Sequence, residues 1–362
     1  MKVLMVGDNF FKPEVVIDCF KNVLAENLDM LEFSELKLPY PVDSLYLDDA
    51  SVIPTGMAWD NNMDADYGKN GVREYYGKDD ILNGKLDDVN ILIVHGVAVP
   101  GYILKQAPAL KLIGCLRGGP VNIDMEVAGQ KGILVTNTPG KNAQGVAEFT
   151  IGLILSHLRN IVSGNRYFID GRYRPYYYNY DVSGFELERK KIGLVGFGRI
   201  SRILTNILKA FGSQIYAYDP YVEKDDIEGF GAFPCDFETL ISECDIVSVH
   251  ARAKKSAPAM FGKKEFALMK KTATFVNTAR GGLVDYPALY EALIGKKIGG
   301  AALDVYGLER FDFYRKLINL PNVTATPHIA GSSRETVLRG SVMMAEEIKR
   351  FINSEELLYK IV

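Results

Sequence analysis

The sequence predicts an α/β protein with two domains, each built around a parallel sheet. Its 362 residues are more than one domain usually holds. From Lys190 to Ala330, short apolar runs alternate with helix-like segments, a pattern typical of a doubly wound parallel sheet. The first of these runs, Ile192 to Val195, opens into Gly196-Phe197-Gly198 and a helical segment. This strand, tight turn and helix predict a Rossmann-type domain, and a smaller flavodoxin-like α/β domain precedes it.

The N-terminal part of the chain has the pattern of the smaller domain. Strand-like runs occur in MKVLMVGDN, LDMLEFSEL, VNILIVHG, LKLIGCL and GILVTNT, and the apolar spacing of PEVVIDCFKNVLAEN is helical. A polar segment from about Pro39 to Lys78 is long for a loop, so it is either a structured insertion or a lid. The helix that starts near Arg334 is expected to return to this domain. Residues 1–143 and 332–362 are therefore the predicted smaller domain.

The predicted Rossmann-type domain comprises residues 144–331. Its first helix, in NAQGVAEFTIGLILSHLRN, has few polar residues and is expected to be buried on most sides. The tyrosine-rich stretch that follows is either a subunit interface or a segment that packs back on its own domain. Residues 145 to about 187 are the candidate dimerisation helix and arm.

The turn after the first strand of this domain predicts a dinucleotide site. Gly196 and Gly198 allow the backbone to turn sharply and to approach a pyrophosphate at the helix N-terminus. Asp219 ends the next strand, 21 residues after Gly198, close to the spacing of about 20 at which an acid holds the adenosine ribose. A carboxylate there repels a 2′-phosphate, so the expected cofactor is NAD. Ser201 replaces the third glycine of the motif and is small enough for close packing of helix on strand.

Three polar residues that follow buried strands are candidates for chemistry: Arg280, Glu309 and His328. Hydride transfer between a secondary alcohol and NAD needs a base for the hydroxyl proton, and a neutral imidazole such as that of His328 suits this task. Arg280 offers the planar cation that fixes a carboxylate, and Glu309 would orient the imidazole. Each residue alone would more often be structural, but their combination beside a nucleotide motif favours catalysis.

Several motifs in a fixed order resemble those of a known family, the D-2-hydroxyacid dehydrogenases, which include phosphoglycerate dehydrogenases and glyoxylate/hydroxypyruvate reductases. The resemblance runs from about Val89 to Arg339 and rests on NTPGKNAQGVAEFT, GLVGFGRI, NTARGGLVD, AALDVY and LPNVTATPHIAGSS. It implies NAD-dependent interconversion of a D-2-hydroxy acid and its 2-oxo acid, with Arg280, Glu309 and His328 as the catalytic set. It also implies that the smaller domain is the substrate-binding domain and that the protein is a homodimer or a dimer of dimers.

The resemblance further implies which residues surround the cofactor. In this family, the residues that match Arg199 and Ile200 approach the pyrophosphate, and the residue that matches Asp304 meets the nicotinamide carboxamide. The expected cofactor-binding residues are Gly196, Gly198, Arg199, Ile200, Asp219, Thr278, Ala279, Asp304 and Gly331.

The substrate loop of the smaller domain departs from the family pattern. It reads LRGGPVNID where many members read closer to GVGxDNID, so Arg117 replaces a glycine. Arg117 either adds a positive charge for a substrate with an extra anionic or polyhydroxylated end, or pairs with a nearby carboxylate. Arg310, after Glu309, stands where the family generally has proline. The expected substrate-binding residues are Val97, Ala98, Arg117, Gly118 and Gly119.

Composition limits the partners of the protein. A net charge of −3 gives no reason to expect nucleic acid or a membrane surface. The four cysteines are widely spaced and form no CxxC pair, so we expect reduced thiols and no metal site. The N-terminal run meets Asp8 too soon for a signal peptide, and no apolar run reaches membrane-spanning length, so we expect a cytoplasmic protein. The alternative function is an NAD(H)-sensing, corepressor-like interaction protein on the same fold. The acid–base set argues against pure sensing, because a binding module needs no such pair.

Overall fold

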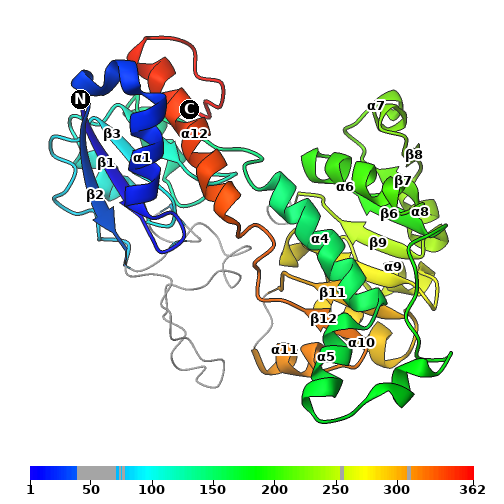
Figure 1. Cartoon of the computed structure of the whole chain (residues 1–362). Coiled ribbons are helices and arrows are strands. Elements are labelled where there is room, and N and C mark those ends of the chain that lie inside the picture. The colour runs from blue at the N-terminus through cyan, green and yellow to red at the C-terminus, as the bar shows by residue number, and fades with distance from the viewer. Residues whose placement is uncertain (39–70, 73–74, 76–77, 253–256, 308–310) are drawn as a thin grey trace. The chain divides into compact units, whose positions relative to one another are not determined.

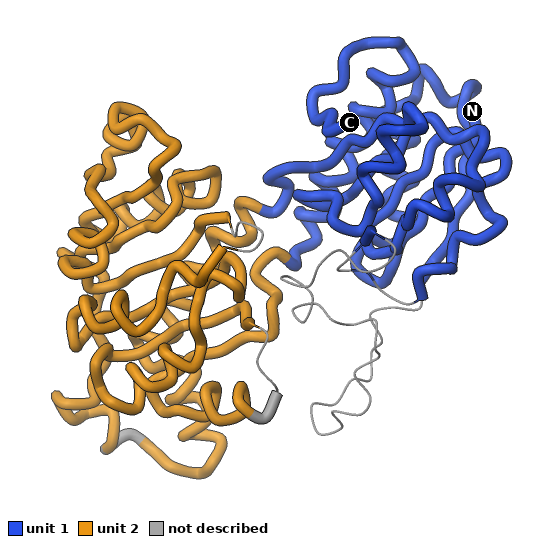
Figure 2. The backbone as a smooth tube through the Cα atoms, turned by 180° about the vertical axis from the view of Figure 1, so that it is seen from behind, with its two compact units in different colours: residues 1–142, 332–362 blue, residues 143–331 orange. Residues whose placement is uncertain are grey.

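Two parallel sheets organise the chain in the computed structural model, which describes residues 1–38, 71–72, 75, 78–252, 257–307 and 311–362. The chain divides into unit 1, Met1–Asn142 with Ser332–Val362, and unit 2, Ala143–Gly331 (Figure 2). Each unit contains one of the sheets. The expected α/β class, with a Rossmann-type sheet and a smaller flavodoxin-like sheet, is confirmed.

The sheet of unit 1 is parallel, with the strand order β2-β1-β3-β4-β5 of flavodoxin-like folds. Strands β1, β2 and β3 are labelled in Figure 1. Successive strand side chains alternate between its faces. Val3 and Met5 pack with helices α1 and α12, whereas Leu4 and Val6 pack with α2 and α3. The elements of unit 1 are β1 Lys2–Gly7, α1 Pro13–Val23, the 3-10 helix η1 Ala25–Met30, β2 Glu32–Lys37, β3 Ile91–Val94, α2 Gly101–Lys105, β4 Leu112–Cys115, α3 Met125–Gln130, β5 Leu134–Asn137 and α12 Arg334–Ile352.

The sheet of unit 2 is also parallel, in the order β12-β11-β10-β9-β6-β7-β8. Helices α4 and α6 cover one face, and α8, α9, α10 and α11 cover the other. The elements are α4 Ala143–Leu158, α5 Ile161–Ile169, η2 Arg174–Tyr178, β6 Lys191–Val195, α6 Arg199–Ala210, β7 Gln214–Tyr218, α7 Lys224–Gly229, β8 Phe233–Pro234, α8 Phe237–Glu243, β9 Ile246–Val249, α9 Lys263–Leu268, β10 Thr274–Asn277, η3 Gly281–Leu283, α10 Tyr286–Ile294, β11 Gly300–Leu303, α11 Phe311–Ile318 and β12 Val323–Ala325.

The strand-like runs of the sequence all form strands, and the short strand β8 is an addition that periodicity did not predict. Helix α12 belongs to unit 1 because its buried residues Val337, Met344 and Ile348 share a core with α1. No described helix combines the length and the apolar character needed to span a membrane. Glu309 and nearly all of the segment 39–78 lie outside the described residues.

Candidate cofactor and catalytic site

The glycine turn after β6 is shaped for a close backbone approach. Gly196 has a φ of 91°, and a Cβ at this position would lie 2.7 Å from the backbone nitrogen of Ala251. Only glycine fits such a position without strain. Gly198 precedes the first residue of α6, and a Cβ there would meet no atom within 4 Å. The N-terminus of α6 therefore faces open space, where its unpaired N–H groups suit an anion such as a pyrophosphate.

Asp219 is fixed beside this turn. Its carboxylate accepts hydrogen bonds from the amides of Phe197, at 2.8 Å, and Tyr221, at 2.9 Å. Each carboxylate oxygen has a second acceptor position, so the group still suits the hydroxyls of a ribose. Ser201 is fully buried and donates its hydroxyl to the carbonyl of Gly196, so the departure from the glycine motif adds a contact.

His250, at the end of β9, is a site residue that the sequence interpretation missed. It directly follows β9, which pairs with β6 in the sheet, and its backbone lies against Gly196. Its Nε2 lies 2.8 Å from the hydroxyl of Ser248, and its buried Nδ1 has no hydrogen-bonding partner among the described residues. Burial lowers the pKa of His250 to about 3, so the imidazole is neutral at physiological pH. Its place at the end of the run DIVSVHA was the only signal in the sequence.

A rigid turn after β10 presents Arg280. The side chain of Asn277 accepts a hydrogen bond from the amide of Ala279 and donates one to the carbonyl of Arg280, each of 3.0 Å. Gly281 lies so close to the chain after β11 that a Cβ would sit 1.5 Å from the carbonyl oxygen of Tyr306. The backbone on both sides of Arg280 is thus fixed, while its guanidinium is exposed and donates to the carbonyl of Ala279 at 2.7 Å.

The loop that carries His328 is held by the buried carboxylate of Asp304. This carboxylate accepts hydrogen bonds from the hydroxyl of Thr326, at 2.6 Å, and from the amides of Ile329, at 3.0 Å, and Ala330, at 2.9 Å. His328 itself has a φ of 57°, in the left-handed region. Such a conformation costs about 1–3 kcal/mol for a residue other than glycine, and it persists only where the surroundings determine it. The three hydrogen bonds to Asp304 fix the backbone on both sides of His328.

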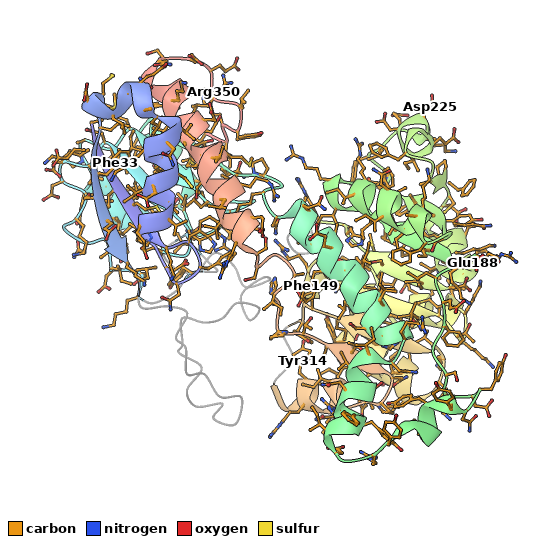
Figure 3. The ribbon with its side chains drawn as sticks, viewed as in Figure 1. Phe33, Phe149, Glu188, Asp225, Tyr314 and Arg350 are labelled. Carbon is orange, nitrogen blue, oxygen red and sulfur yellow. The ribbon has the colours of Figure 1, made fainter. Side chains whose placement is uncertain are left out.

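The chain after β11 is tied to the same loop. The hydroxyl of Tyr306 donates to the carbonyl of Thr326 at 2.8 Å. The amide of Gly307 donates to the hydroxyl of Tyr314 at 2.6 Å, and Tyr314 is labelled in Figure 3. This segment leads to Glu309, whose expected contact with His328 lies outside the described residues.

The other expected cofactor residues follow the same sheet edge. Arg199 and Ile200 open α6, the first exposed and the second half-buried. Thr278 is buried, and its hydroxyl lies 2.8 Å from that of Thr150 in α4. Gly331 ends unit 2. Unit 2 thus brings the glycine turn, Asp219, His250, the Arg280 turn and the His328 loop to the carboxyl edge of one parallel sheet, where ligands bind in open α/β folds.

The expected substrate residues lie at the corresponding edge of unit 1. The side chains of Val97 and Ala98 are fully buried, so only their backbone is placed to meet a ligand. Arg117 is half-buried after β4. A Cβ at Gly118 or Gly119 would meet no atom within 4 Å, so open space lies beside both glycines.

Buried Asn122, which the sequence interpretation missed, supports this edge. Its amide donates to the carbonyl of Val97 at 2.6 Å and to that of His95 at 3.3 Å. The link spans more than 20 residues of sequence, so no local pattern revealed it.

Comparisons with known proteins identify the family of this chain. Residues 151–330 match the family described as D-isomer specific 2-hydroxyacid dehydrogenase, NAD binding domain. The chain is 38% identical over 258 residues to a D-3-phosphoglycerate dehydrogenase of Archaeoglobus fulgidus, covering 71% of this chain and 48% of that protein. It is 35% identical over 278 residues to a hydroxypyruvate reductase of Thermotoga maritima, covering 76% of this chain and 88% of that protein.

The fold is similar to that of the NAD-complexed D-isomer specific 2-hydroxyacid dehydrogenase from Lactobacillus delbrueckii ssp. bulgaricus, with a TM-score of 0.75 and 22% identity, covering 100% of both chains. The chain spans about half the length of the D-3-phosphoglycerate dehydrogenases of A. fulgidus and Methanocaldococcus jannaschii. The match to the NAD-binding domain confirms NAD as the cofactor. This chain belongs to the family of D-isomer specific 2-hydroxyacid dehydrogenases.

Proposed function

We propose that this protein is an NAD-dependent oxidoreductase that interconverts a D-2-hydroxy acid and its 2-oxo acid. Arg280 fixes the substrate carboxylate, His328 exchanges the hydroxyl proton, and Glu309 orients the imidazole. The observation that carries the proposal is the left-handed His328, held by Asp304 at the sheet edge where NAD fits. Backbone strain of this kind clusters at active sites and ligand clamps.

The residues of this chain have distinct tasks in such a reaction. Bound NAD supplies the hydride acceptor or donor. The planar guanidinium of Arg280 matches a carboxylate in a bidentate contact and so orients the carbon that reacts. In oxidation, the imidazole of His328 takes the hydroxyl proton, and in reduction it returns that proton to the oxygen. A carboxylate at Glu309 would stabilise the imidazolium that oxidation creates.

The substrate is expected to be a small acid. The relatives named above are a D-3-phosphoglycerate dehydrogenase and a hydroxypyruvate reductase, and these names support 2-hydroxy and 2-oxo acids of about three carbons. Both relatives are enzymes, so they lend no support to the corepressor-like alternative.

We infer a homodimer formed through the arm that follows α4. Isolated large apolar side chains are common on surfaces, but a group of them on one segment marks an interface. Exposed large apolar residues of this arm are Ile161, Val162, Phe168, Ile169, Tyr173, Tyr176, Tyr178, Tyr180 and Phe185. The cytoplasmic location stays a prediction from the sequence.

Oxidation of NADH by the purified full chain with glyoxylate, pyruvate and hydroxypyruvate tests the proposed function. We expect turnover of at least one of these acids. Arg280→Lys keeps the charge but loses the bidentate geometry, so it should raise KM at least about tenfold while NADH binding is unchanged. NADH binding without turnover of any 2-oxo acid would contradict the enzyme assignment and favour the sensing alternative.

A further inference from the structure

A largely buried group of ionisable residues lies at the carboxyl edge of the sheet in unit 1. Asp8 follows β1 and His95 follows β3, the two neighbouring strands between which the strand order reverses. In flavodoxin-like sheets, this reversal point is where ligands bind. Arg117 follows β4, and Lys141 lies four residues beyond the end of β5. The chain thus brings two cations and a carboxylate to the ligand-binding edge of one sheet.

The carboxylate of this group is already satisfied. Asp8 is fully buried, and its oxygens accept hydrogen bonds from His95 Nδ1 at 2.5 Å and from the amides of Phe10 and Phe11 at 2.9 and 2.8 Å. Burial alone would raise the pKa of Asp8, but His95 and the two amides outweigh it and lower this pKa. Burial lowers the pKa of His95, so we assign a neutral imidazole that donates from Nδ1. Asp8 is therefore engaged by groups other than Lys141.

Lys141, unlike Asp8, is a buried ion whose charged group has no hydrogen-bonded or ion-paired partner among the described residues. The residue is 7% exposed, and its ammonium makes no hydrogen bond or ion pair with any described residue. Its polar contact is with the ring of Phe11, whose centroid lies 4.7 Å from Nζ. Lysine is almost never so buried unless it is paired, because removing its charge from water is costly.

The surroundings make room for this lysine and hold its backbone. A Cβ on Gly340, in α12, would lie 2.8 Å from Lys141 Cδ and 3.3 Å from a ring carbon of Phe11. The guanidinium of Arg339, on the same helix, donates to the carbonyl oxygen of Lys141. Because α12 is shaped around the stem of Lys141, the position of the ammonium is built into the fold.

We propose that Lys141 and Arg117 form an anion subsite in unit 1 that binds a second anionic group of the substrate, a phosphate or a carboxylate. An anion at this position gives Lys141 the partner that the described protein lacks. The glycines after Arg117 leave open space beside it. This inference rests on the proposed function for the identity of the ligand, but binding of an anion in unit 1 is independent of turnover.

Binding is tested with inorganic phosphate on the full chain. Thermal unfolding is followed in phosphate and in chloride at equal ionic strength and neutral pH, and phosphate affinity is measured by calorimetric titration. Phosphate should stabilise the wild type and not Lys141→Met, which keeps the apolar stem. Lys111→Met is the matched control, because Lys111 is exposed and precedes β4, at the opposite edge of the sheet. Equal stabilisation of wild type and Lys141→Met would overturn the subsite.

Selectivity is tested by kcat/KM for 2-oxo acids of one and two negative groups. Phosphohydroxypyruvate and 2-oxoglutarate distinguish a phosphate from a carboxylate as the second group, and glyoxylate and hydroxypyruvate lack one. Lys141→Met should lose at least about tenfold on its preferred dianion, equivalent to about 1.4 kcal/mol, and less than about twofold on the monoanions. Equal losses on both classes would overturn the assignment of the second group to this subsite.

The two proposals fail in different ways. If phosphate stabilises the wild type through Lys141 but no 2-oxo acid is turned over, the anion subsite stands and the dehydrogenase function falls. If 2-oxo acids are turned over with the same selectivity by wild type and Lys141→Met, the function stands and the subsite falls.

Discussion

In unit 2, the carboxylates of Asp219 and Asp304 lie at the edge of the sheet, and both accept hydrogen bonds from backbone amides. In unit 1, by contrast, the ammonium of the buried Lys141 has no hydrogen bond or ion pair with a described residue. Burial first, and then the charge of Arg117, lower the pKa of Lys141 from 10.5 to about 8. This shift corresponds to a loss of about 3 kcal/mol from the stability of the fold at neutral pH. The edge of unit 2 is preorganised by two carboxylates whose hydrogen bonds are formed before any ligand binds. At the edge of unit 1, the ammonium of Lys141 has no hydrogen bond or ion pair with a described residue, and its proposed task is to select the ligand.

The largest expected effect lies in unit 2. His328→Asn should lower kcat by about 10² to 10⁴-fold, because the amide cannot exchange the hydroxyl proton. Asparagine tolerates the left-handed backbone that His328 adopts, so the loop should keep its shape. NADH oxidation gives kcat, and a fluorescence titration should show unchanged NADH affinity. Wild-type turnover by this variant would remove His328 from its role.

The next largest effect on kcat is expected at Asp304, which holds the loop that carries His328. Asp304→Asn replaces one acceptor oxygen by an NH2 group, so the hydrogen bonds to Thr326, Ile329 and Ala330 cannot all survive. Displacement of His328 should lower kcat by about 10²-fold. Asp236→Asn is the matched control, since Asp236 also accepts a backbone amide but at the exposed start of α8. If the two variants have the same kcat, Asp304 does not position the catalytic loop.

The sequence was most informative where function depends on local spacing. The glycine turn, Asp219 and Ser201 lie within about one strand–helix–strand unit, so their distances along the chain revealed their relation. Lys141 was missed because α12, some 200 residues later, buries it. The pair Asp8 and His95 joins residues 87 apart. No single-sequence pattern encodes such contacts, which arise only when the sheet assembles.

The roles of two predicted residues illustrate the same limit. The resemblance placed Asp304 against the nicotinamide carboxamide, and that contact stays a prediction. What the fold adds is three hydrogen bonds to the His328 loop. For Arg117, the sequence left a substrate contact and a carboxylate pair equally open, and both stay predictions.

A smaller effect is expected on the stability of unit 1. Lys141→Met removes a buried charge and keeps a similar volume, so it should stabilise the protein by about 2 kcal/mol, or about 4–8 °C in Tm, in chloride buffer. The measurement is thermal or urea unfolding of the full chain. Lys111→Met should change stability by no more than about 0.5 kcal/mol. Destabilisation by Lys141→Met would show that the lysine is held by favourable contacts, contrary to this account.

The smallest expected effect is the pH dependence of the stability that Lys141→Met gains. The folded pKa of Lys141 lies below its unfolded value, so the unfolded state binds more protons between about pH 8 and 10.5. The cost of the buried charge is therefore complete below pH 8 and disappears as the pH rises towards 10.5. The stability difference between Lys141→Met and wild type should be largest at neutral pH and shrink over this window. The groups that influence Lys141 include Arg117, Cys115, Asp8 and the neighbouring Arg339.

The difference between the two edges is tested most directly by measuring kcat/KM for phosphohydroxypyruvate and glyoxylate in the wild type, His328→Asn and Lys141→Met. We expect His328→Asn to reduce both values by a similar factor, because the proton is exchanged with every substrate. We expect Lys141→Met to reduce the phosphohydroxypyruvate value alone. If Lys141→Met lowers both values equally, or if His328→Asn spares either one, the division between a catalytic edge and a selecting edge is wrong.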